Sequence, residues 1–228
     1  MESSPPSSAI LSQPSTVQVH AAAAPTVKEP LLKRPFDACL AGLGLVLSAP
    51  LWGLIALAIK VEDGGPVFFR QERWGRGKRP MEVYKFRTMT PNADRTVQAT
   101  EDDPRITRVG RILRATALDE MPQLLNIWKG GMSFVGPRAL PMNERQVRED
   151  GVEISDEQIA GFEDRLRVRP GLTGIAQIWA PRDIPRRHKF KYDLFYLKKQ
   201  SFGLDLKLIA LSFWITFRGR WEVRGRKY

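Results

Sequence analysis

The chain has 228 residues, 43% of them hydrophobic, and its 36 Lys and Arg against 25 Asp and Glu give a formal net charge of +11. This length suits one domain with a hydrophobic core and appendages, and the charge indicates an anionic partner such as nucleic acid, an acidic membrane surface or a phosphorylated substrate. Cys39 is the only cysteine, which excludes an intramolecular disulfide framework and a zinc site built from cysteines.

Residues 1–30 are rich in Ser, Pro and Ala and carry almost no large apolar residues in a periodic pattern. Such a segment buries too little surface to order itself, so we expect a disordered N-terminal arm. The first residues, Met1 to Pro6, contain no basic group ahead of an apolar core, which argues against a secretory signal.

An uncharged run from Ala38 to Ile59 follows, and its roughly 22 residues are enough for a helix that crosses a bilayer. Basic residues flank both ends, beginning with Lys33 and Arg34, and such residues favour the cytoplasmic side. Pro50 would bend the helix and let it re-enter on the side from which it came. The sequence leaves three alternatives: a re-entrant helix, a kinked transmembrane helix and a buried core helix.

Two polar side chains in this region need partners. Asp37 lies just inside the membrane interface, where we expect it to pair with Lys33 or Arg34. Pro50 frees a backbone carbonyl, and we expect the hydroxyl of Ser48 to recapture one.

Apolar residues alternate with polar ones in the next segments, Val67–Gln71 and Met81–Arg87, on either side of a turn containing Gly75 and Gly77. This pattern predicts a β-hairpin. Alternation puts Lys85 and Arg87 on one face, where they either serve a substrate or are solvated charges of an edge hairpin.

The polar segment from Thr88 to Asp103 is predicted to be a loop. It ends in the acidic triplet Glu101-Asp102-Asp103, which is either a metal ligand set or ordinary loop chemistry before a proline. Apolar residues then recur at helical spacing from Ile106 to Leu113, which predicts a helix that exposes three arginines. They are Arg108, Arg111 and Arg114.

Asp119 and Glu120 follow this helix. Pro122 is tolerated only in a first helical turn, so we expect a new helix from near Leu118 or Asp119 to about Trp128, with the acids at its positive end. With arginines before and after them, the acids mark a place where phosphate oxygens and a bound divalent metal could meet, which is a setting for phosphoryl transfer. The alternative is capping chemistry, since Thr116 with Asp119 fits a capping box.

The C-terminal part of the chain, from Ser133 to Phe217, contains a loop, a glycine-rich turn and helical patterns. Ser133–Arg138 is predicted to be a tight loop that holds Arg138 toward a phosphate, and residues 143–165 a polar surface helix. Arg165–Gly174 leads into a glycine-rich turn whose amides are expected to cradle an anion. Tyr192–Phe217 is expected to be helical, packing either on the core or in a membrane interface with Trp214 and Trp221 as anchors.

Taken together, the ordered motifs resemble those of the bacterial sugar transferases, also called monotopic phosphoglycosyl transferases, from about residue 31 to about residue 210. The motifs are Lys33-Arg34 with Asp37, the apolar run, Gly65-Pro66-Val67-Phe68-Phe69-Arg70-Gln71, Tyr84-Lys85-Phe86-Arg87, Leu118-Asp119-Glu120-Met121-Pro122-Gln123-Leu124, Val135-Gly136-Pro137-Arg138 and Arg169-Pro170-Gly171-Leu172-Thr173-Gly174.

The resemblance implies an α/β fold, mostly helical with a small β-hairpin. It divides the chain into the arm at 1–30, a re-entrant membrane helix at 31–61, whose interface residues are Lys33, Arg34, Asp37 and Pro50, and a catalytic domain at 62–228 with interfacial amphipathic helices. The implied location is the cytoplasmic face of the bacterial inner membrane, without crossing it.

The implied activity is transfer of a sugar-1-phosphate from a nucleoside diphosphate sugar to a polyprenyl phosphate such as undecaprenyl phosphate. This step starts exopolysaccharide, O-antigen or glycoconjugate assembly. Asp119 resembles the family's nucleophile and Glu120 its Mg²⁺ ligand, and both are taken as catalytic. Phosphate or substrate binding falls to four basic residues, Lys85, Arg87, Arg114 and Arg138.

The chain departs from the family pattern at two places. Ala49 separates Ser48 from Pro50, which are usually adjacent, and Ala139 follows Arg138 where a proline is usual. A homo-oligomer is one further partner arrangement that the sequence allows. The alternative function is a membrane-tethered basic domain that binds anionic lipid or nucleic acid through residues 165–191, although no nucleic-acid recognition motif supports the latter.

Overall fold

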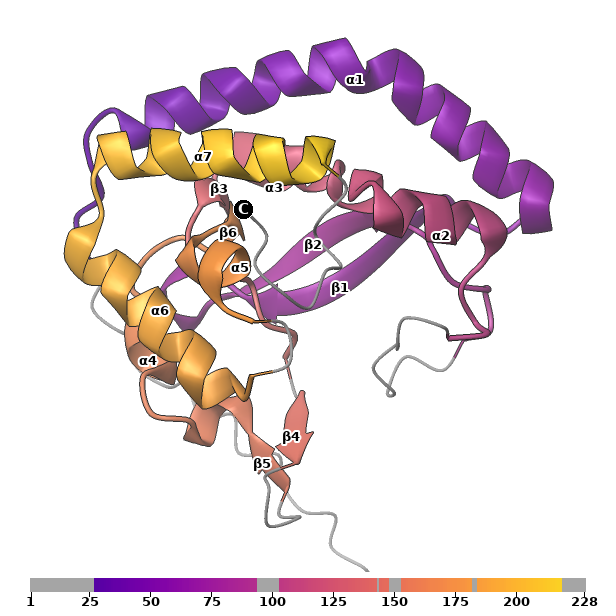
Figure 1. Cartoon of the computed structure of the whole chain (residues 1–228). Helices are drawn as coiled ribbons and strands as arrows, with labels where there is room; N and C mark the ends of the chain where they lie inside the picture. The colour runs from indigo at the N-terminus through magenta and orange to yellow at the C-terminus, as the bar shows by residue number, and fades with distance from the viewer. Residues whose placement is uncertain (1–26, 94–102, 143, 148–152, 182–183, 219–228) are drawn as a thin grey trace, which may run out of the picture.

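The long helix α1 (Lys33–Asp63) arches over the rest of the protein in the computed structural model, which describes residues 27–93, 103–142, 144–147, 153–181 and 184–218 (Figure 1). Of the described helices, only α1 is long and apolar enough to cross a membrane, with a mean hydropathy of 2.0. Only 11% of its most apolar window is buried inside the protein, which argues against a buried core helix.

α1 bends near its middle in Figure 1, and Pro50 lies inside it. A proline at this position leaves the carbonyl of Val46 without its helical donor. The hydroxyl of Ser48 points instead to the carbonyl of Leu45. The distance of 3.5 Å is long for a hydrogen bond, and this carbonyl is not the one that Pro50 frees. The expectation that Ser48 recaptures the freed carbonyl is therefore wrong.

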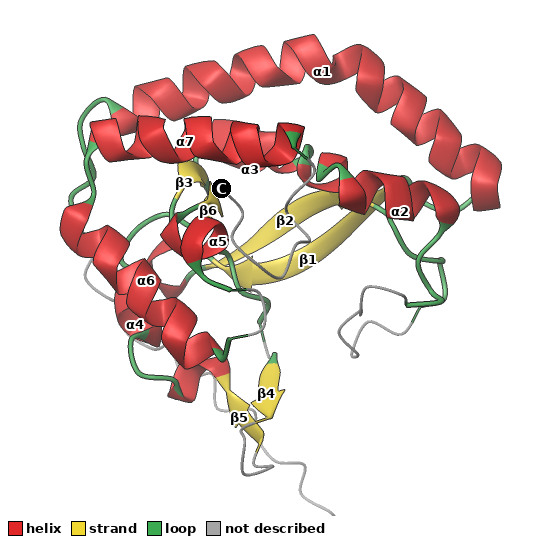
Figure 2. Cartoon of the chain, viewed as in Figure 1, coloured by secondary structure: helices red, strands yellow, loops and turns green. Residues whose placement is uncertain are grey.

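Beneath α1 lies a body of short elements (Figure 2). The helices are α2 (Arg108–Ala115), α3 (Gln123–Lys129), α4 (Phe162–Arg165), α5 (Ile175–Trp179), α6 (Arg186–Lys199) and α7 (Phe202–Phe217). The strands pair as β1 (Phe68–Trp74) with β2 (Pro80–Phe86), β3 (Ser133–Val135) with β6 (Gly171–Thr173), and β4 (Arg145–Val147) with β5 (Glu153–Ser155). The fold is thus α/β and mostly helical, as predicted.

The predicted hairpin is confirmed as β1 and β2, which pair antiparallel with Phe69 opposite Lys85. Phe86 is 1% exposed and packs with Ile55 and Ile59 of α1 and Leu113 of α2. The hairpin and α2 thereby contact the second half of α1, whereas α3 packs under its first half through Trp128, close to Gly42.

The main core joins the first half of α1 to the strands β3 and β6 and to the helices α5, α6 and α7. Its fully buried members include Ala41, Ile127, Val135, Ile178, Tyr196, Leu208 and Ile215. The apolar stripe predicted for the last helix therefore packs on the core through Leu208 and Ile215. Its other side stays open to solvent, with Phe213 and Phe217 exposed.

The surface helix expected over residues 143–165 is wrong. That stretch contains β4, β5, a 3₁₀ turn at Asp156–Gln158 and the short α4. Its frequent charges suggested a solvated helix, but Ile159 and Phe162 are buried in a second core. Ser155 and Gln158 form a capping box that starts the 3₁₀ turn, a short-range signal that competes with one long helix.

The end of the expected N-terminal arm contacts the domain, while residues 1–26 lie outside the described part. The amide of Val27 donates to the carbonyl of Arg167 at 2.9 Å, and Glu29 forms an ion pair with Arg169. Residues 27–30 are therefore placed by contacts with the domain, unlike the disordered arm expected there.

Candidate active site

Asp119 and Glu120 lie on a 3₁₀ turn, Leu118–Glu120, that joins α2 to α3. The expected helix start near Leu118 is wrong, because α3 begins only at Gln123, after Pro122. Ala117 precedes the turn with φ 56° and ψ 17°, a left-handed conformation that costs an L-residue about 1–2 kcal/mol and turns the chain sharply.

The capping explanation of the acid pair is also wrong. The hydroxyl of Thr116 donates back to the carbonyl of Ile112 at 2.8 Å and so completes α2. No side chain caps the start of the 3₁₀ turn or of α3. Both carboxylates are therefore available for other contacts.

Both carboxylates contact cationic side chains. Nζ of Lys85, on β2, lies 2.5 Å from Oε1 of Glu120 and 3.9 Å from Oδ2 of Asp119. Nη2 of Arg138 lies 3.2 Å from the same Oε1. Glu120 thus shares one oxygen between two cations, whereas the described part of the chain gives Asp119 only the long contact to Lys85.

These surroundings divide the two carboxylates electrostatically. Burial raises the pKa of Asp119 to about 6, although Lys85 opposes the shift and the charge of Glu120 adds to it. For Glu120, burial is outweighed by Lys85 and Arg138, so its pKa lies below the ordinary value. Glu120 is therefore the more strongly ionised carboxylate of the pair, and Asp119 is the one that binds a proton more readily.

Asn126 fixes the turn and β2 relative to each other. Its Nδ2 donates to the carbonyl of Glu82 at 2.6 Å, and its Oδ1 accepts from the amide of Tyr84 at 3.2 Å. The side chain thereby pairs with the edge of β2 as a neighbouring strand would, which sets Lys85 opposite the acids. No sequence pattern predicts this role, because an asparagine inside a helix usually faces solvent or a helix end.

Arg73 on β1 is a further cation that the sequence analysis missed. Its Nη1 donates to the carbonyl of Ala139 at 2.8 Å, and its Nη2 to Oε1 of Gln71 at 2.7 Å. Burial, with the nearby charge of Arg138, lowers its pKa to about 10. Strand alternation puts Arg73 on the same face of the hairpin as Lys85, which was the available signal.

The remaining predicted phosphate-binding residues are divided. Arg114 donates to the hydroxyl of Thr88 at 3.0 Å, and its charge acts on Asp119 from a distance. Arg87 instead pairs with Asp63, with Nη1 2.7 Å from Oδ2, so the structure does not bring it to the acid pair. Of the acidic triplet, Asp103 pairs with Arg105, and the other two acids lie outside the described residues.

Three of the four predicted interface residues contact the domain, whereas Pro50 is exposed in the middle of α1. Lys33 pairs with Asp205 of α7 at 2.7 Å and donates to the carbonyl of Val135 at 2.9 Å. Arg34 donates to the carbonyls at the end of α3. Asp37 accepts from the amide of Phe134 at 3.3 Å, so its expected pairing with Lys33 or Arg34 is wrong.

The glycine-rich turn packs against the loop that carries Arg138, and this contact occupies the amide of Gly171, one of those expected to cradle an anion. The amide of Gly171 donates to the carbonyl of Pro137, and the amide of Gly136 to the carbonyl of Thr173, both at 2.9 Å. Glycine is required here because a Cβ on Gly171 would lie 2.0 Å from the backbone nitrogen of Gly136. The glycines serve close approach of the backbone to the loop that carries Arg138.

The acid turn suits a hard cation such as Mg²⁺, because carboxylate oxygens are its preferred protein ligands. Within the described ranges no three His, Cys, Asp or Glu side chains gather. Mg²⁺ commonly takes one or two carboxylates and completes its shell with substrate phosphates and water, so Glu120 with Asp119 fits an ion shared with a substrate. The ion would compete with Lys85 and Arg138 for Glu120.

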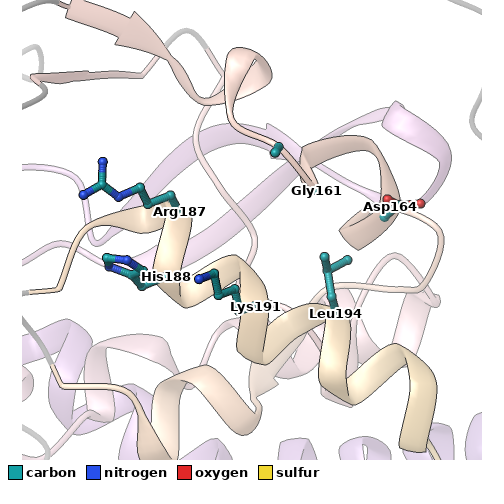
Figure 3. Close-up of a pocket in the computed structure, with 7 residues that line it drawn as sticks. Gly161, Asp164, Arg187, His188, Lys191 and Leu194 are labelled. Carbon is teal, nitrogen blue, oxygen red and sulfur yellow. The ribbon is translucent and has the colours of Figure 1, made fainter.

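A separate hollow of about 520 Å³ lies between the start of α4 and α6, remote in sequence from the acids (Figure 3). Arg187, His188 and Lys191 line it from α6, and Gly161 and Asp164 line it from the start of α4. None of the predicted site residues lines it.

Three of the described basic residues between 165 and 191 form ion pairs within the protein. Arg165 is 2% exposed and paired with Asp193, and Arg169 and Arg186 pair with Glu29 and Asp156. These three charges are neutralised by carboxylates of the protein itself, which disfavours the alternative of a basic binding domain.

Comparison with known proteins agrees with the geometry. Residues 28–219 match the family described as bacterial sugar transferase. The UDP-glucose:undecaprenyl-phosphate glucose-1-phosphate transferase of Escherichia coli K12 is 42% identical over 198 residues, covering 83% of this chain but only 40% of its own length. A Caulobacter vibrioides protein with the same description is 41% identical, covering 81% of this chain and 69% of its own.

A shorter relative is matched over almost its whole length. The exopolysaccharide production protein PSS of Rhizobium leguminosarum bv. phaseoli is 39% identical over 187 residues, which are 78% of this chain and 92% of that protein.

Proposed function

The chain belongs to the bacterial sugar transferase family, and on that premise we propose that it transfers a sugar-1-phosphate from a nucleoside diphosphate sugar to a polyprenyl phosphate. The names of its relatives point to UDP-glucose as donor, undecaprenyl phosphate as acceptor and exopolysaccharide synthesis as the pathway. The observation that carries the proposal is the acid pair, in which Glu120 is bound by two cations and Asp119 is left for a reacting group.

In the first step, an oxygen of Asp119 attacks the phosphorus that bears the sugar. The new O–P bond replaces the bond to the bridging oxygen, which leaves with the nucleoside monophosphate. In the second step, a phosphate oxygen of the polyprenyl carrier attacks the same phosphorus and displaces the carboxylate of Asp119. A covalent intermediate lets a water-soluble donor and a lipid acceptor use one site in turn.

The cations around the pair stabilise the charge that develops on the transferred phosphate. Lys85 and Arg138 already converge on Glu120, and Arg114 and Arg73 add positive charge nearby. Because these groups are held by the fold before the donor arrives, they need little reorganisation during the reaction. Mg²⁺, held by Glu120 with help from Asp119, would supply further charge neutralisation of the diphosphate.

We propose that α1 is a re-entrant helix that enters the cytoplasmic leaflet of the bacterial inner membrane and returns. Its support is that both ends of α1 are fastened to one body. Lys33 binds Asp205, while Glu62 accepts from the amides that start α2, at 2.6 and 3.2 Å. A helix of 31 residues is about 46 Å long and, crossing straight, would separate its ends by a whole bilayer.

The outward side of α1 supports this placement, because its large apolar residues are exposed. They are Leu43, Val46, Leu47, Leu51, Leu54, Leu57 and Val61. On α7 the exposed Phe213, Trp214 and Phe217 suit an interfacial helix, with the guanidinium of Arg218 stacked on Trp214 at 4.3 Å.

A release assay tests the proposed activity. Purified protein is given polyprenyl phosphate and a panel of sugar nucleotides, with Mg²⁺ or with a chelator, and nucleoside monophosphate is measured. We expect Mg²⁺-dependent release from UDP-glucose. A binding domain without catalysis would release none from any donor, which would reject the proposal.

A further inference from the structure

The guanidinium of Arg138 is poorly fixed by its own contacts. Its side chain is 49% exposed, and its contact with Glu120 at 3.2 Å is an exposed ion pair of a kind that holds a long side chain weakly. Its direction therefore depends on how firmly its backbone is held.

That backbone is held at four consecutive carbonyls. Those of Pro137 and Leu140 accept the amides of Gly171 and Trp74, both at 2.9 Å. The two between them accept arginine side chains instead: the carbonyl of Arg138 accepts from Nη2 of the buried Arg165 at 2.6 Å, and that of Ala139 accepts from Nη1 of the half-buried Arg73 at 2.8 Å.

Arg165 is itself an unusual residue to find there. It is 2% exposed and is among the largest fully buried side chains of the described residues. Its Nε donates to Oδ2 of Asp193, on α6, at 2.9 Å, and its guanidinium stacks on the ring of Phe190 at 4.8 Å. A buried ion pair is often no more stabilising than apolar residues of similar volume, so stability alone gives little reason for one at this place.

We propose that Arg165, oriented by Asp193, is a positioning residue that aims Arg138 at the acid pair through the carbonyl of Arg138. This inference rests on the proposed function for its kinetic test. The planar guanidinium is suited to the role because it binds Asp193 through one nitrogen and the loop carbonyl through another. A lysine has a single nitrogen and cannot hold that geometry.

The first test is a kinetic cycle built from Arg165→Lys and Arg138→Ala. We expect Arg165→Lys to lower kcat by about 100-fold, the scale of a misplacement of about 1 Å, with little change in KM. In the Arg138→Ala background the same change should have almost no further effect, because its target is gone. Effects that multiply would overturn the proposal.

The matched control is Arg167→Lys, the same substitution two residues away on a side chain that is 38% exposed. It should leave kcat unchanged. A paired variant, Arg165→Met with Asp193→Leu, removes both charges and is expected to retain the wild-type melting temperature while remaining slow. Recovery of the full rate in that variant would overturn the proposal.

The second test does not depend on activity. Hydrogen exchange of a peptide covering residues 136–140 should speed up in Arg165→Lys and stay unchanged in Arg167→Lys. If wild-type protein releases no nucleotide, the proposed function fails while this measurement still decides the positioning role. Unchanged exchange in Arg165→Lys would overturn it.

Discussion

Asp119 and Glu120 are neighbours in the chain, yet the fold treats them differently at the scale of single residues. Glu120 meets Lys85 at 2.5 Å and Arg138 at 3.2 Å through one oxygen, whereas Asp119 is 3.9 Å from Lys85. A nucleophile must keep an oxygen free, and a metal ligand must stay ionised. The observed contacts suit Asp119 to the first role and Glu120 to the second.

Glu120→Gln should therefore impair the enzyme through its metal. We expect a higher Mg²⁺ concentration for half-maximal rate, and a loss of at least about 10–100-fold, which removal of outer-shell partners alone can produce. A titration of rate against Mg²⁺ measures both. Glu82→Gln is the control, since Glu82 lies 3.8 Å from Arg70 on the hairpin, away from the acids. An unchanged Mg²⁺ dependence in Glu120→Gln would contradict the assignment.

At the scale of elements, α1 is secured by side chains far from it in sequence. Lys33 and Asp205 are 172 residues apart, and both are 3% exposed. The hydroxyl of Tyr196 also donates to Asp205 at 2.8 Å, so α1, α6 and α7 meet in one buried polar cluster. The first turn of α1 is thereby part of the domain.

Lys33→Met should destabilise the protein by about 3–5 kcal/mol, because it leaves the carboxylate of Asp205 buried without its cation. Denaturant unfolding in detergent measures the loss. Lys207→Met, at an exposed position of α7, should change stability by less than about 0.5 kcal/mol. Lys33→Met with Asp205→Leu should recover most of the loss. Equal stability of Lys33→Met and wild type would contradict the role of the pair.

The sequence predicted those elements that short-range patterns determine. Strand alternation on both sides of a glycine turn identified β1 and β2, and the apolar run identified α1. It misplaced the start of α3, because the left-handed Ala117 and a 3₁₀ turn that contacts both α2 and β2 come before it, and no short-range pattern predicts a left-handed alanine. It also predicted one surface helix over residues 143–165, where the structure has two short strands, a 3₁₀ turn and the short α4, because charged neighbours concealed the buried Phe162.

The site was predictable to a similar degree. The sequence motifs contain the acid pair, Lys85 and Arg138, and the structure brings these residues together. Arg73 and Asn126 were missed because their roles consist of hydrogen bonds to backbone atoms of other elements. Arg87 was placed at the site by its strand face, but Asp63 at the end of α1 offers it a closer partner.

At the scale of the whole molecule, the arm and the domain should lie on the same side of the membrane, with α1 entering the bilayer from that side and returning to it. Residues 27–30 contact the domain, and both ends of α1 are fastened to it. We expect single cysteines at Ser15 and Lys199, in a Cys39→Ser background, to escape a membrane-impermeant thiol reagent until the cells are opened. Labelling at position 15 in intact cells would reject the re-entrant helix in favour of a span.

Pro50→Ala tests the cause of that topology. Restoring the missing amide should straighten α1 and raise the labelled fraction at position 15. Ala49→Gly, a neighbouring change that leaves the proline in place, is the control. Identical labelling of Pro50→Ala and its parent would show that the bend does not depend on the proline.

Membrane attachment should depend mainly on apolar surface. The outward apolar residues of α1 are exposed on the protein, so they should stay in lipid at any ionic strength, whereas salt screens the basic flanks. A high-salt wash of membranes should therefore release only a minor fraction of the protein. Complete release would contradict insertion of α1.

The central claim is that Asp119 carries the sugar phosphate between donor and acceptor. Its most direct measurement is mass spectrometry of the protein after incubation with UDP-glucose and Mg²⁺ in the absence of polyprenyl phosphate. We predict a hexose-phosphate adduct on the peptide that contains Asp119, its discharge on addition of polyprenyl phosphate, and its absence in Asp119→Asn. An adduct on another residue, or turnover by Asp119→Asn at a near-normal rate, would contradict the mechanism.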